Sequence, residues 1–398
     1  MNNQTTPVHF RLWHHEFWLL VIADLLMTMS VYMLIPTFPS WLMVEQQLTP
    51  VETGLSMMAF AAGLYLFGPL CSWLVQQYRR NVVCMWAIAA LALNVFLLGY
   101  FSPLTSFPRA LIHRVALGAA FGLAQMVLAS TLIIDTCESH QRTEANFGAA
   151  WFSRFALSLG PVAGLALAIL PTNNLLAQLH CHQSQITPVL FVSGIVALVS
   201  MLLISRVSFP FRTPEEGVCI ASLDRFFLPS GFVLFLNLLL ISTVVGMLLS
   251  QPLSLVFYAM MMGGFLLALL AQRFVFRNAE LKSEVISGLI LLLASVLVQL
   301  VYPVSLVSPL LLGMAVGIVS SRFLLFFVKL SRHCQRGTSQ STYFLAWDTG
   351  LALGVGIGYC LFYDCRDLLF YTCLCVTGVS LLMYHFVTHR WFMKHKNR

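Results

Sequence analysis

Long apolar runs, separated by short polar connectors, dominate this chain. A helix needs roughly 20 apolar residues to cross a hydrocarbon core about 30 Å thick. Twelve stretches meet this requirement, namely 17–38, 52–75, 82–101, 110–134, 146–170, 188–205, 229–249, 253–271, 285–303, 307–328, 340–362 and 368–388. We count 229–249 and 253–271 separately, because Gln251-Pro252 interrupts them and proline breaks a helix. The pattern therefore predicts an all-α integral membrane protein with twelve transmembrane helices.

The composition excludes a soluble protein. Hydrophobic residues make up 59% of the 398 residues and charged residues only 9%, whereas a soluble chain carries about 25% charge. We therefore expect the lipid bilayer to surround almost the whole chain. The ten cysteines form no framework that would hold a metal, so we expect no metal and no cofactor.

Lysine and arginine are distributed unevenly between the two sides of the predicted bundle. With the N-terminus inside, seventeen of the 22 fall in inner loops and tails, and the outer loops hold only Arg109 and Arg366. The remaining three, Arg114, Arg154 and Arg322, fall inside spans. The positive-inside rule then predicts that both termini are cytoplasmic in a multi-pass protein of the cell's inner (plasma) membrane. This distribution explains the net charge of +7 without a nucleic-acid partner, and we expect none.

The polar loop 206–228 divides the spans into two groups of six. We expect an N-terminal six-helix bundle over 1–205, a cytoplasmic linker over 206–228 and a C-terminal six-helix bundle over 229–398. At a lag of 194 residues, six identities appear in 24 positions. Gln141-Arg142, Leu157, Leu159, Gly160 and Gly164 match Gln335-Arg336, Leu351, Leu353, Gly354 and Gly358. Such weak internal symmetry is typical of secondary transporters and predicts two pseudo-symmetric bundles.

Glycine pairs reinforce the repeat. Gly118 and Gly122 have the GxxxG spacing that lets helix backbones approach closely, and Gly313 and Gly317 repeat it in the second half.

This arrangement resembles the major facilitator superfamily (MFS), and local motifs carry the resemblance. The run from Gly68-Pro69 to Arg79-Arg80 looks like the family's loop between spans two and three, with Gln76 in place of the usual acidic residue and Arg79 in place of a glycine. His113-Arg114 with Gly118 and Gly122 is similar to the fourth-span motif, and Gly160-Pro161 with Gly164 resembles the fifth-span motif of proton-coupled exporters.

The resemblance implies an MFS fold, a small-molecule substrate, coupling to protons and a monomer. It also implies roles for two sets of residues. Helix packing and hinges are expected at Gly68, Pro69, Gly118, Gly122, Gly160, Pro161, Gly164, Gly354 and Gly358, and a gating loop at Arg79, Arg80, Arg142 and Arg336.

Five charged residues inside the spans are the candidate substrate or proton pathway: Asp24, Arg114, Arg154, Arg322 and Asp348. A charge in the bilayer interior is costly and marks either a pathway or a buried pair. All except Arg114 are expected in one layer roughly 10–12 Å from the cytoplasmic face, and Arg114 roughly 8 Å from the outer face with no acid at its depth. In one interpretation Asp24 pairs with Arg154, and Asp348 with Arg322. In the other, a carboxylate exchanges a proton or binds a cation during transport.

Arg114 has no predicted partner, so we expect it to face the central cavity and contact the substrate or the proton pathway. Neutral residues within spans are weaker candidates for the cavity wall: Tyr65, Gln125, Asn237, Tyr343 and Trp347.

Three functions remain open. We favour a proton-coupled exporter that works by alternating access. Because three arginines and two aspartates leave the spans with a net charge of +1, import of an organic anion is the alternative. A non-transporting receptor or scaffold of the same fold is the third, and Gln76 is its best support. An enzyme is not expected, because the sequence lacks G-x-S-x-G and H-E-x-x-H motifs.

We predict that the tail after residue 389 and the loop 206–228 face the cytoplasm, because the basic residues are concentrated on that side. Single cysteines introduced in these segments should react with a membrane-impermeant maleimide only after the membrane is opened. Labelling from outside in intact cells would overturn this topology.

Overall fold

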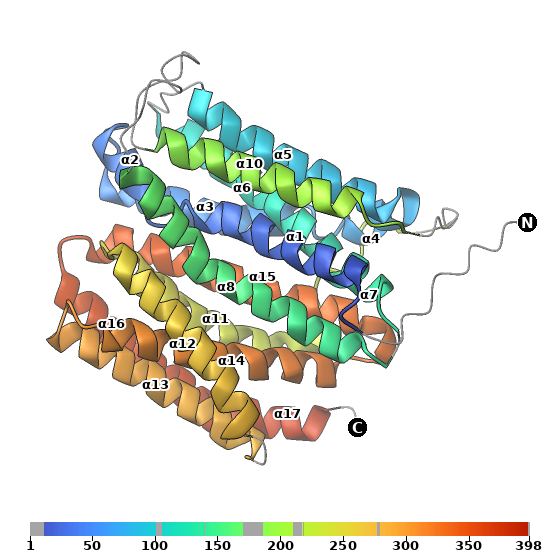
Figure 1. Ribbon diagram of the computed structural model, residues 1–398. Coiled ribbons are helices and arrows are strands. Elements are labelled where there is room, and N and C mark those ends of the chain that lie inside the picture. Colours follow the sequence, from blue (N-terminus) through green and yellow to red (C-terminus); the bar gives the residue numbers. More distant parts are fainter. Residues whose placement is uncertain are drawn as a thin grey trace, which may run out of the picture.

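The computed structural model describes residues 12–100, 106–138, 140–169, 186–209, 217, 219–276 and 279–396, and helices account for most of them (Figure 1). The first half contains α1 (His15–Tyr32), α2 (Phe38–Val44), α3 (Pro50–Leu66), α4 (Cys71–Gln77), α5 (Arg80–Tyr100), α6 (Phe107–Val127), the π-helix η1 (Leu128–Leu132), α7 (Ile133–Asp135), α8 (Arg142–Ile169) and α10 (Thr187–Ser205). The second half contains η2 (Pro229–Gly231), α11 (Phe232–Leu249), α12 (Leu255–Phe274), α13 (Leu281–Val301), α14 (Val307–Leu330), η3 (His333–Gln335), α15 (Arg336–Phe362), α16 (Arg366–Met383), η4 (Tyr384–Thr388) and α17 (His389–His395). These described ranges contain no strand.

The helices confirm the predicted membrane fold. Within the described ranges, eleven helices are long and apolar enough to cross a membrane, and α3 with α4 makes a twelfth span if the two count as one. The axes of α3 and α4 meet at 49°, and Gly68-Pro69 lies in the break between them. The break between α11 and α12 contains Gln251-Pro252, as the sequence predicts.

Two helices, α8 and α15, begin earlier than the apolar stretches that predict them. The sequence predicts spans from 146 and 340, but α8 begins at Arg142 and α15 at Arg336. The polar first turns of α15 are helical, and their hydroxyls are satisfied by backbone carbonyls within the helix, as that of Thr342 is by Thr338 at 2.8 Å. Asp348 therefore lies twelve residues from the start of its helix, roughly 18 Å along the axis and deeper than predicted.

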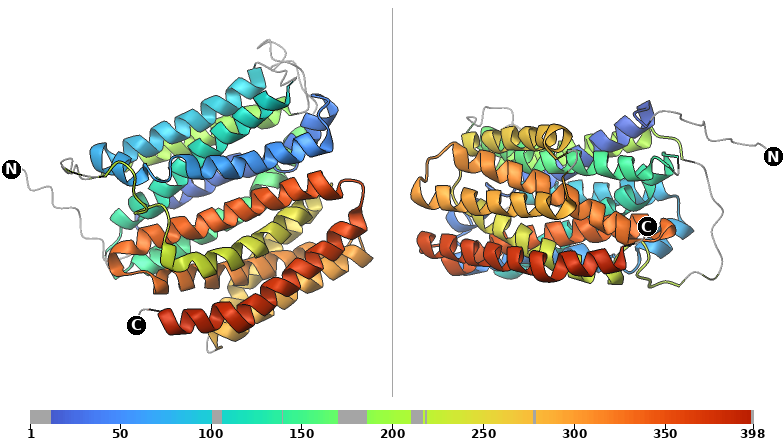
Figure 2. Two further views of the ribbon diagram at one scale, coloured as in Figure 1. Left: turned by 180° about the vertical axis from the view of Figure 1, so that it is seen from behind. Right: turned by 90° about the horizontal axis from the view of Figure 1, so that it is seen from below.

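Both ends of the described chain lie at one end of the bundle. α1 begins and α17 finishes on the same side in every view (Figures 1 and 2). We call this the basic end, because it carries the residues Arg79, Arg80, Arg225, Arg332 and Lys394. The opposite end carries Gln47, Ser254 and Tyr363.

The same helix pairs pack in both halves. α1 packs on α8 as α11 packs on α15, and α3 packs on α6 as α12 packs on α14. Contacts between the halves are made by α3 with α15 and by α8 with α12 and α14.

Glycines permit the close crossings in this repeated arrangement. A Cβ on Gly118 would run into the carbonyl oxygen of Phe60 in α3, and a Cβ on Gly313 would run into the carbonyl oxygen of Met261 in α12. The other glycines singled out in the spans also meet a neighbouring helix at short range: Gly122, Gly160, Gly164, Gly354 and Gly358. Pro161 lies inside α8, which continues through it.

The π-helix η1 is a local irregularity near the basic end. It carries Ser130, whose backbone lies directly against Gly337 at the start of α15. Beyond it, α7 ends at Asp135, whose carboxylate pairs with Arg80 at the start of α5. The end of the fourth span therefore makes two contacts: η1 touches the second half, and α7 forms an ion pair within the first half.

We predict that Gly118→Ala lowers the free energy of unfolding by about 1–3 kcal/mol, because the added methyl group would overpack the α3–α6 crossing. Gly378→Ala is the matched control, since no heavy atom lies within 4 Å of its Cβ position. The midpoint of thermal unfolding in detergent measures both. Equal shifts in the two variants would contradict a packing role for Gly118.

Candidate functional site

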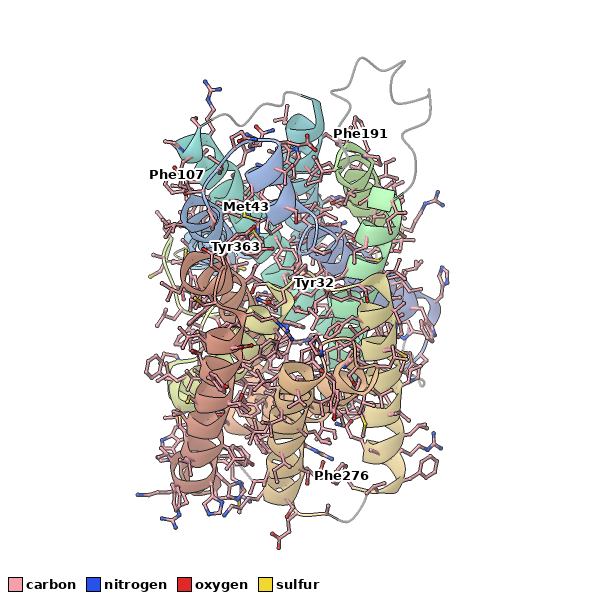
Figure 3. All side chains as sticks on the ribbon, turned by 90° about the vertical axis from the view of Figure 1, so that its left-hand side faces the viewer. Tyr32, Met43, Phe107, Phe191, Phe276 and Tyr363 are labelled. Carbon is pink, nitrogen blue, oxygen red and sulfur yellow. The ribbon has the colours of Figure 1, made fainter. Side chains whose placement is uncertain are left out.

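A hydrogen bond between the two halves marks the centre of the molecule. The Tyr32 hydroxyl in α1 donates to Asp348 Oδ1 in α15 at 2.5 Å. Viewed with the left-hand side of Figure 1 facing the reader, Tyr32 lies between the halves (Figure 3). Asp348 is only 1% exposed, yet its second oxygen, Oδ2, has no hydrogen-bond partner. A buried carboxylate oxygen without a donor is costly, so this atom is available to a proton or a ligand.

Arg114 lines the same cavity as Asp348. The guanidinium lies 5.0 Å from the centre of the Phe38 ring and 5.2 Å from that of Phe60. Its Nε is buried without a partner, and among the described residues no acidic group lies within ion-pair distance. The two aromatic faces replace part of its hydration by cation–π interaction. The rest of the cavity wall is apolar apart from Tyr32: Val31, Leu34, Ile35, Met57, Leu351, Ala352 and Val355.

The cavity is small, and a larger vestibule lies beyond it. The cavity holds about 30 Å³, which accommodates about two water molecules. One turn further along α15, a space of about 670 Å³ is lined by Tyr359 and Tyr363 together with Pro36, Ser40 and Met43. This volume is in the range of pockets that bind small organic molecules. The vestibule lies at the end of the bundle opposite to the basic end.

Arg154 links the halves closer to the basic end. Its guanidinium donates to the hydroxyl of Ser321 in α14 at 2.8 Å and to that of Tyr343 in α15 at 3.3 Å. The indole of Trp151, one turn earlier in α8, lies 4.8 Å away. This arginine is therefore held by neutral groups of the other half.

Asp24 is buried within the first half. It accepts a hydrogen bond from Ser153 of α8, and its Oδ1 has no partner. It is not among the residues that line the central cavity. It lies near enough to Asp348 for the two charges to interact.

Of the two interpretations of the buried charges, the structure does not support the one that pairs Asp24 with Arg154 and Asp348 with Arg322. No ion pair joins either couple in the part of the chain that the structure describes. Arg322 instead pairs with Glu284 at the start of α13. The sequence places Glu284 one residue outside a predicted span, whereas the helix begins at Leu281 and carries it to the buried side. Arg322 is thereby satisfied within the second half, away from the cavity.

Arg114 forms no ion pair with an acid among the described residues, yet one acid, Asp348, lines the same cavity. Asp348 lies deeper than expected because α15 starts at Arg336. This brings its carboxylate to the cavity that Arg114 reaches from the opposite end.

Several polar partners carry no charge, which is why sequence reasoning missed them. Tyr32, Ser153 and Ser321 give no signal in the sequence, because hydroxyl residues are common in spans. Of the weaker candidates, Tyr343 contacts Arg154, Gln125 lies beside Asp348 and Trp347 lies beside Tyr32. Tyr65 bonds Thr349 at 2.8 Å. Asn237 instead donates to the Ser380 carbonyl at 3.1 Å in the second half.

The four arginines expected in a gating loop lie at the basic end on separate elements. Arg79 is exposed beside α4, and Arg80 pairs with Asp135. Arg142 and Arg336 are the first residues of α8 and α15. Across the described ranges, no cluster of three or more histidine, cysteine or acidic side chains is suited to a metal ion.

Comparison with known proteins agrees with this architecture. The family model described as Major Facilitator Superfamily matches residues 20–355. The crystal structure of the nucleoside transporter NupG is similar with a TM-score of 0.62 at 11% identity, covering 96% of this chain and 100% of that chain. The crystal structure of the human organic anion transporter MFSD10 is similar with a TM-score of 0.60 at 16% identity, covering 92% and 98%. At these identities the likeness shows a shared fold.

We predict opposite effects on stability for two buried arginines. Arg114→Met should leave the free energy of unfolding unchanged or raise it, because it removes a buried charge that has no acidic partner. Arg154→Met should lower it by about 1–3 kcal/mol, because two hydrogen bonds between the halves are lost. Thermal unfolding in detergent measures both, and an Arg114→Met variant as destabilised as Arg154→Met would make Arg114 a structural residue.

Proposed function

Because this chain belongs to the Major Facilitator Superfamily, a family of membrane transporters rather than enzymes, we propose that it exports a small solute in exchange for protons by alternating access. The solute enters the space between the two halves, and the halves open at one end of the bundle at a time. The positive-inside distribution of Lys and Arg supports a cytoplasmic basic end in the plasma membrane. The chain acts as a monomer.

One observation carries the proposal. Arg114 from the first half and Asp348 from the second half are both buried, each has a polar atom without a partner, and both line one cavity. Unsatisfied groups of this kind are retained where a ligand, a proton or water completes them. A site divided between the halves also changes shape when the halves move.

Asp348 is the proposed proton acceptor. Its Oδ1 is held by Tyr32, and its Oδ2 makes no hydrogen bond, although the amide of Gln125 lies beside the carboxylate. When Asp348 is ionised, it accepts a charge-assisted hydrogen bond from Tyr32 of the other half. When a proton arrives through the vestibule, the bond from Tyr32 becomes a weaker neutral one, and the halves lose part of their contact. Asp24 interacts electrostatically with Asp348 and is the second carboxylate of the proposed pathway.

Import of an organic anion is the second candidate. Arg114 offers a planar cation that suits a carboxylate or phosphate, and one structural neighbour is an organic anion transporter. A monoanion on Arg114 would face the carboxylate of Asp348, so it would bind best together with a proton on Asp348. A receptor or scaffold remains the third possibility, favoured by Gln76, whose side chain bonds Ser72 of its own helix at 3.4 Å.

We predict that proteoliposomes containing the chain move solute against its gradient when a pH gradient is imposed. A nucleoside such as uridine, the anion para-aminohippurate and a lipophilic cation serve as probes of three charge classes. Asp348→Asn should abolish transport driven by the pH gradient while retaining downhill exchange, because its side chain can still accept from Tyr32 but cannot carry a proton. Arg114→Lys should weaken transport only of anions.

Thr372→Val is the matched control, because its hydroxyl bonds only the Leu368 carbonyl of its own helix. Uphill transport that persists in Asp348→Asn would remove Asp348 from the coupling mechanism. Absence of transport for all three probe classes would favour the receptor or scaffold.

A further inference from the structure

A short segment of the linker lies across the basic end and is bonded to both halves. We call residues 222–228 the strap. On the first half, the Ser222 amide donates to the Pro69 carbonyl at 2.9 Å. The ring of Phe226 occupies the space beside Gly68, at the bend between α3 and α4. The strap therefore fills the break in the second span.

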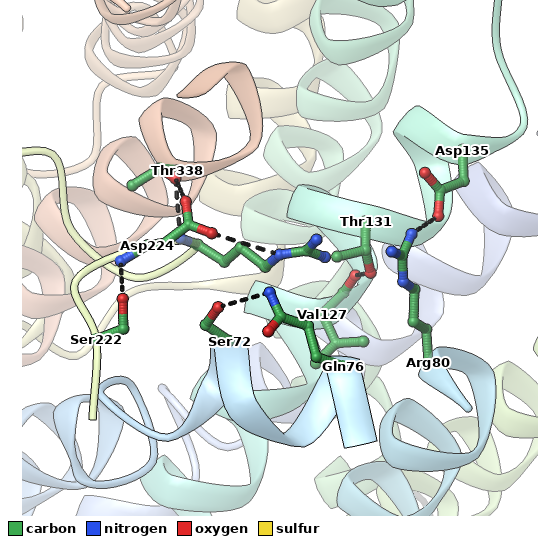
Figure 4. A network of polar contacts seen from close by, with 10 residues as sticks. Ser72, Gln76, Arg80, Val127, Thr131, Asp135, Ser222, Asp224 and Thr338 are labelled. Atoms are coloured by element: carbon green, nitrogen blue, oxygen red, sulfur yellow. Dashed lines mark hydrogen bonds and ion pairs between the residues drawn. The ribbon is translucent and has the colours of Figure 1, made fainter. Parts of the chain in front are cut away.

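The second half holds the strap through two threonines of α15. The Arg225 amide donates to Thr338 Oγ1 at 2.9 Å, and the Leu228 amide donates to Thr342 Oγ1 at 2.8 Å. The Thr338 hydroxyl in turn donates to the Asp224 carboxylate at 3.1 Å (Figure 4). These threonines are buried, so the bonds exclude water.

The backbone of the strap is strained at its centre. Arg225 has φ of +59°, a region that costs a non-glycine residue roughly 1 kcal/mol. The hydrogen bond from its backbone amide to Thr338 and its ion pair with Asp224, at 3.7 Å, hold Arg225 in this conformation. Such strain persists only where surrounding contacts determine the conformation, so loss of the Thr338 contact releases it.

The strap is also connected to the central site. The ring of Phe226 packs edge-on to that of Tyr65, with centroids 6.1 Å apart. The Tyr65 hydroxyl bonds Thr349, the residue after Asp348. Motion of the halves at the centre therefore reaches the strap through two contacts.

We propose that the strap is the gate of the basic end, closed while the vestibule is open at the opposite end and released from Thr338 and Thr342 when the basic end opens. The inference rests on alternating access between the halves. When α15 moves away from the bend at Gly68-Pro69, the strap cannot keep its hydrogen bonds to α15 and its contacts with the bend at the same time.

The test measures access to the two ends without any transport assay. Ser130→Cys reports the basic end, because Ser130 is buried against Gly337. Ser40→Cys reports the vestibule, which Ser40 lines as an exposed residue. Maleimide labelling of purified protein is compared with the same variant without the reporter cysteine, so that labelling of native cysteines is subtracted.

The double substitution Thr338→Val and Thr342→Val keeps the side-chain shape but removes both acceptors. It should raise labelling at Ser130→Cys about tenfold and lower labelling at Ser40→Cys. Thr377→Val is the control, since it removes a buried hydroxyl that bonds only the Cys373 carbonyl within α16. It should change neither rate.

Unchanged labelling at both reporters would overturn the gate, and so would a rise at both, which would indicate general loosening. These outcomes are independent of transport. If the protein transports but the double substitution changes no labelling, the strap is not the gate and the proposed function stands. If labelling rises at Ser130→Cys and falls at Ser40→Cys but no transport is found, the gate stands and the transport proposal is contradicted.

Discussion

The cost of keeping a charge away from water shapes the interior of this protein. Four of the five charged residues predicted within spans are satisfied at least in part by hydroxyl groups or aromatic rings rather than by opposite charges. Tyr32 donates to Asp348, Ser153 to Asp24, and Arg154 donates to Ser321 and Tyr343. Arg114 lies against Phe38 and Phe60. Each such bond to a charged group contributes about 1.5–3 kcal/mol net, and separating its two members leaves no second charge buried without a partner.

Neutral partners for the buried charges suit an interface between the two halves that must open. A buried ion pair between the halves would be strongly destabilising to break, because it would leave an uncompensated charge. The pair that does form at membrane depth, Arg322 with Glu284, lies within the second half and need not separate during a rigid-body movement. The bonds between the halves, by contrast, are made by hydroxyl groups that water can replace as the space between the halves fills.

Much of the fold could be predicted from the sequence, but the contacts of the site could not. Apolar run length locates the spans, and Gln251-Pro252 separates α11 from α12, because these signals act within one segment of the chain. Glycine spacing locates the helix crossings for the same reason. The partners of Arg154 and Asp348 depend on which helix faces meet, and a hydroxyl residue gives no signal of that. The predicted depth of Asp348 is wrong for a further reason. Because α15 includes several polar residues before its apolar stretch begins, a boundary drawn from hydropathy misplaces Asp348 along the membrane axis.

The π-helix η1 lets the fourth span hold one residue more than a regular α-helix of the same length. A π-turn contains one more residue than an α-turn, so the widened turn takes up the extra residue and the helix on either side keeps its direction. Deleting one residue between Leu128 and Leu132 would therefore return the span to regular α-helix and leave α7, with Asp135 beside Arg80, close to its place. The residues of the turn itself would shift, and the backbone of Ser130 would leave Gly337. The extra residue thus serves the contact between the halves and not the ion pair within the first half.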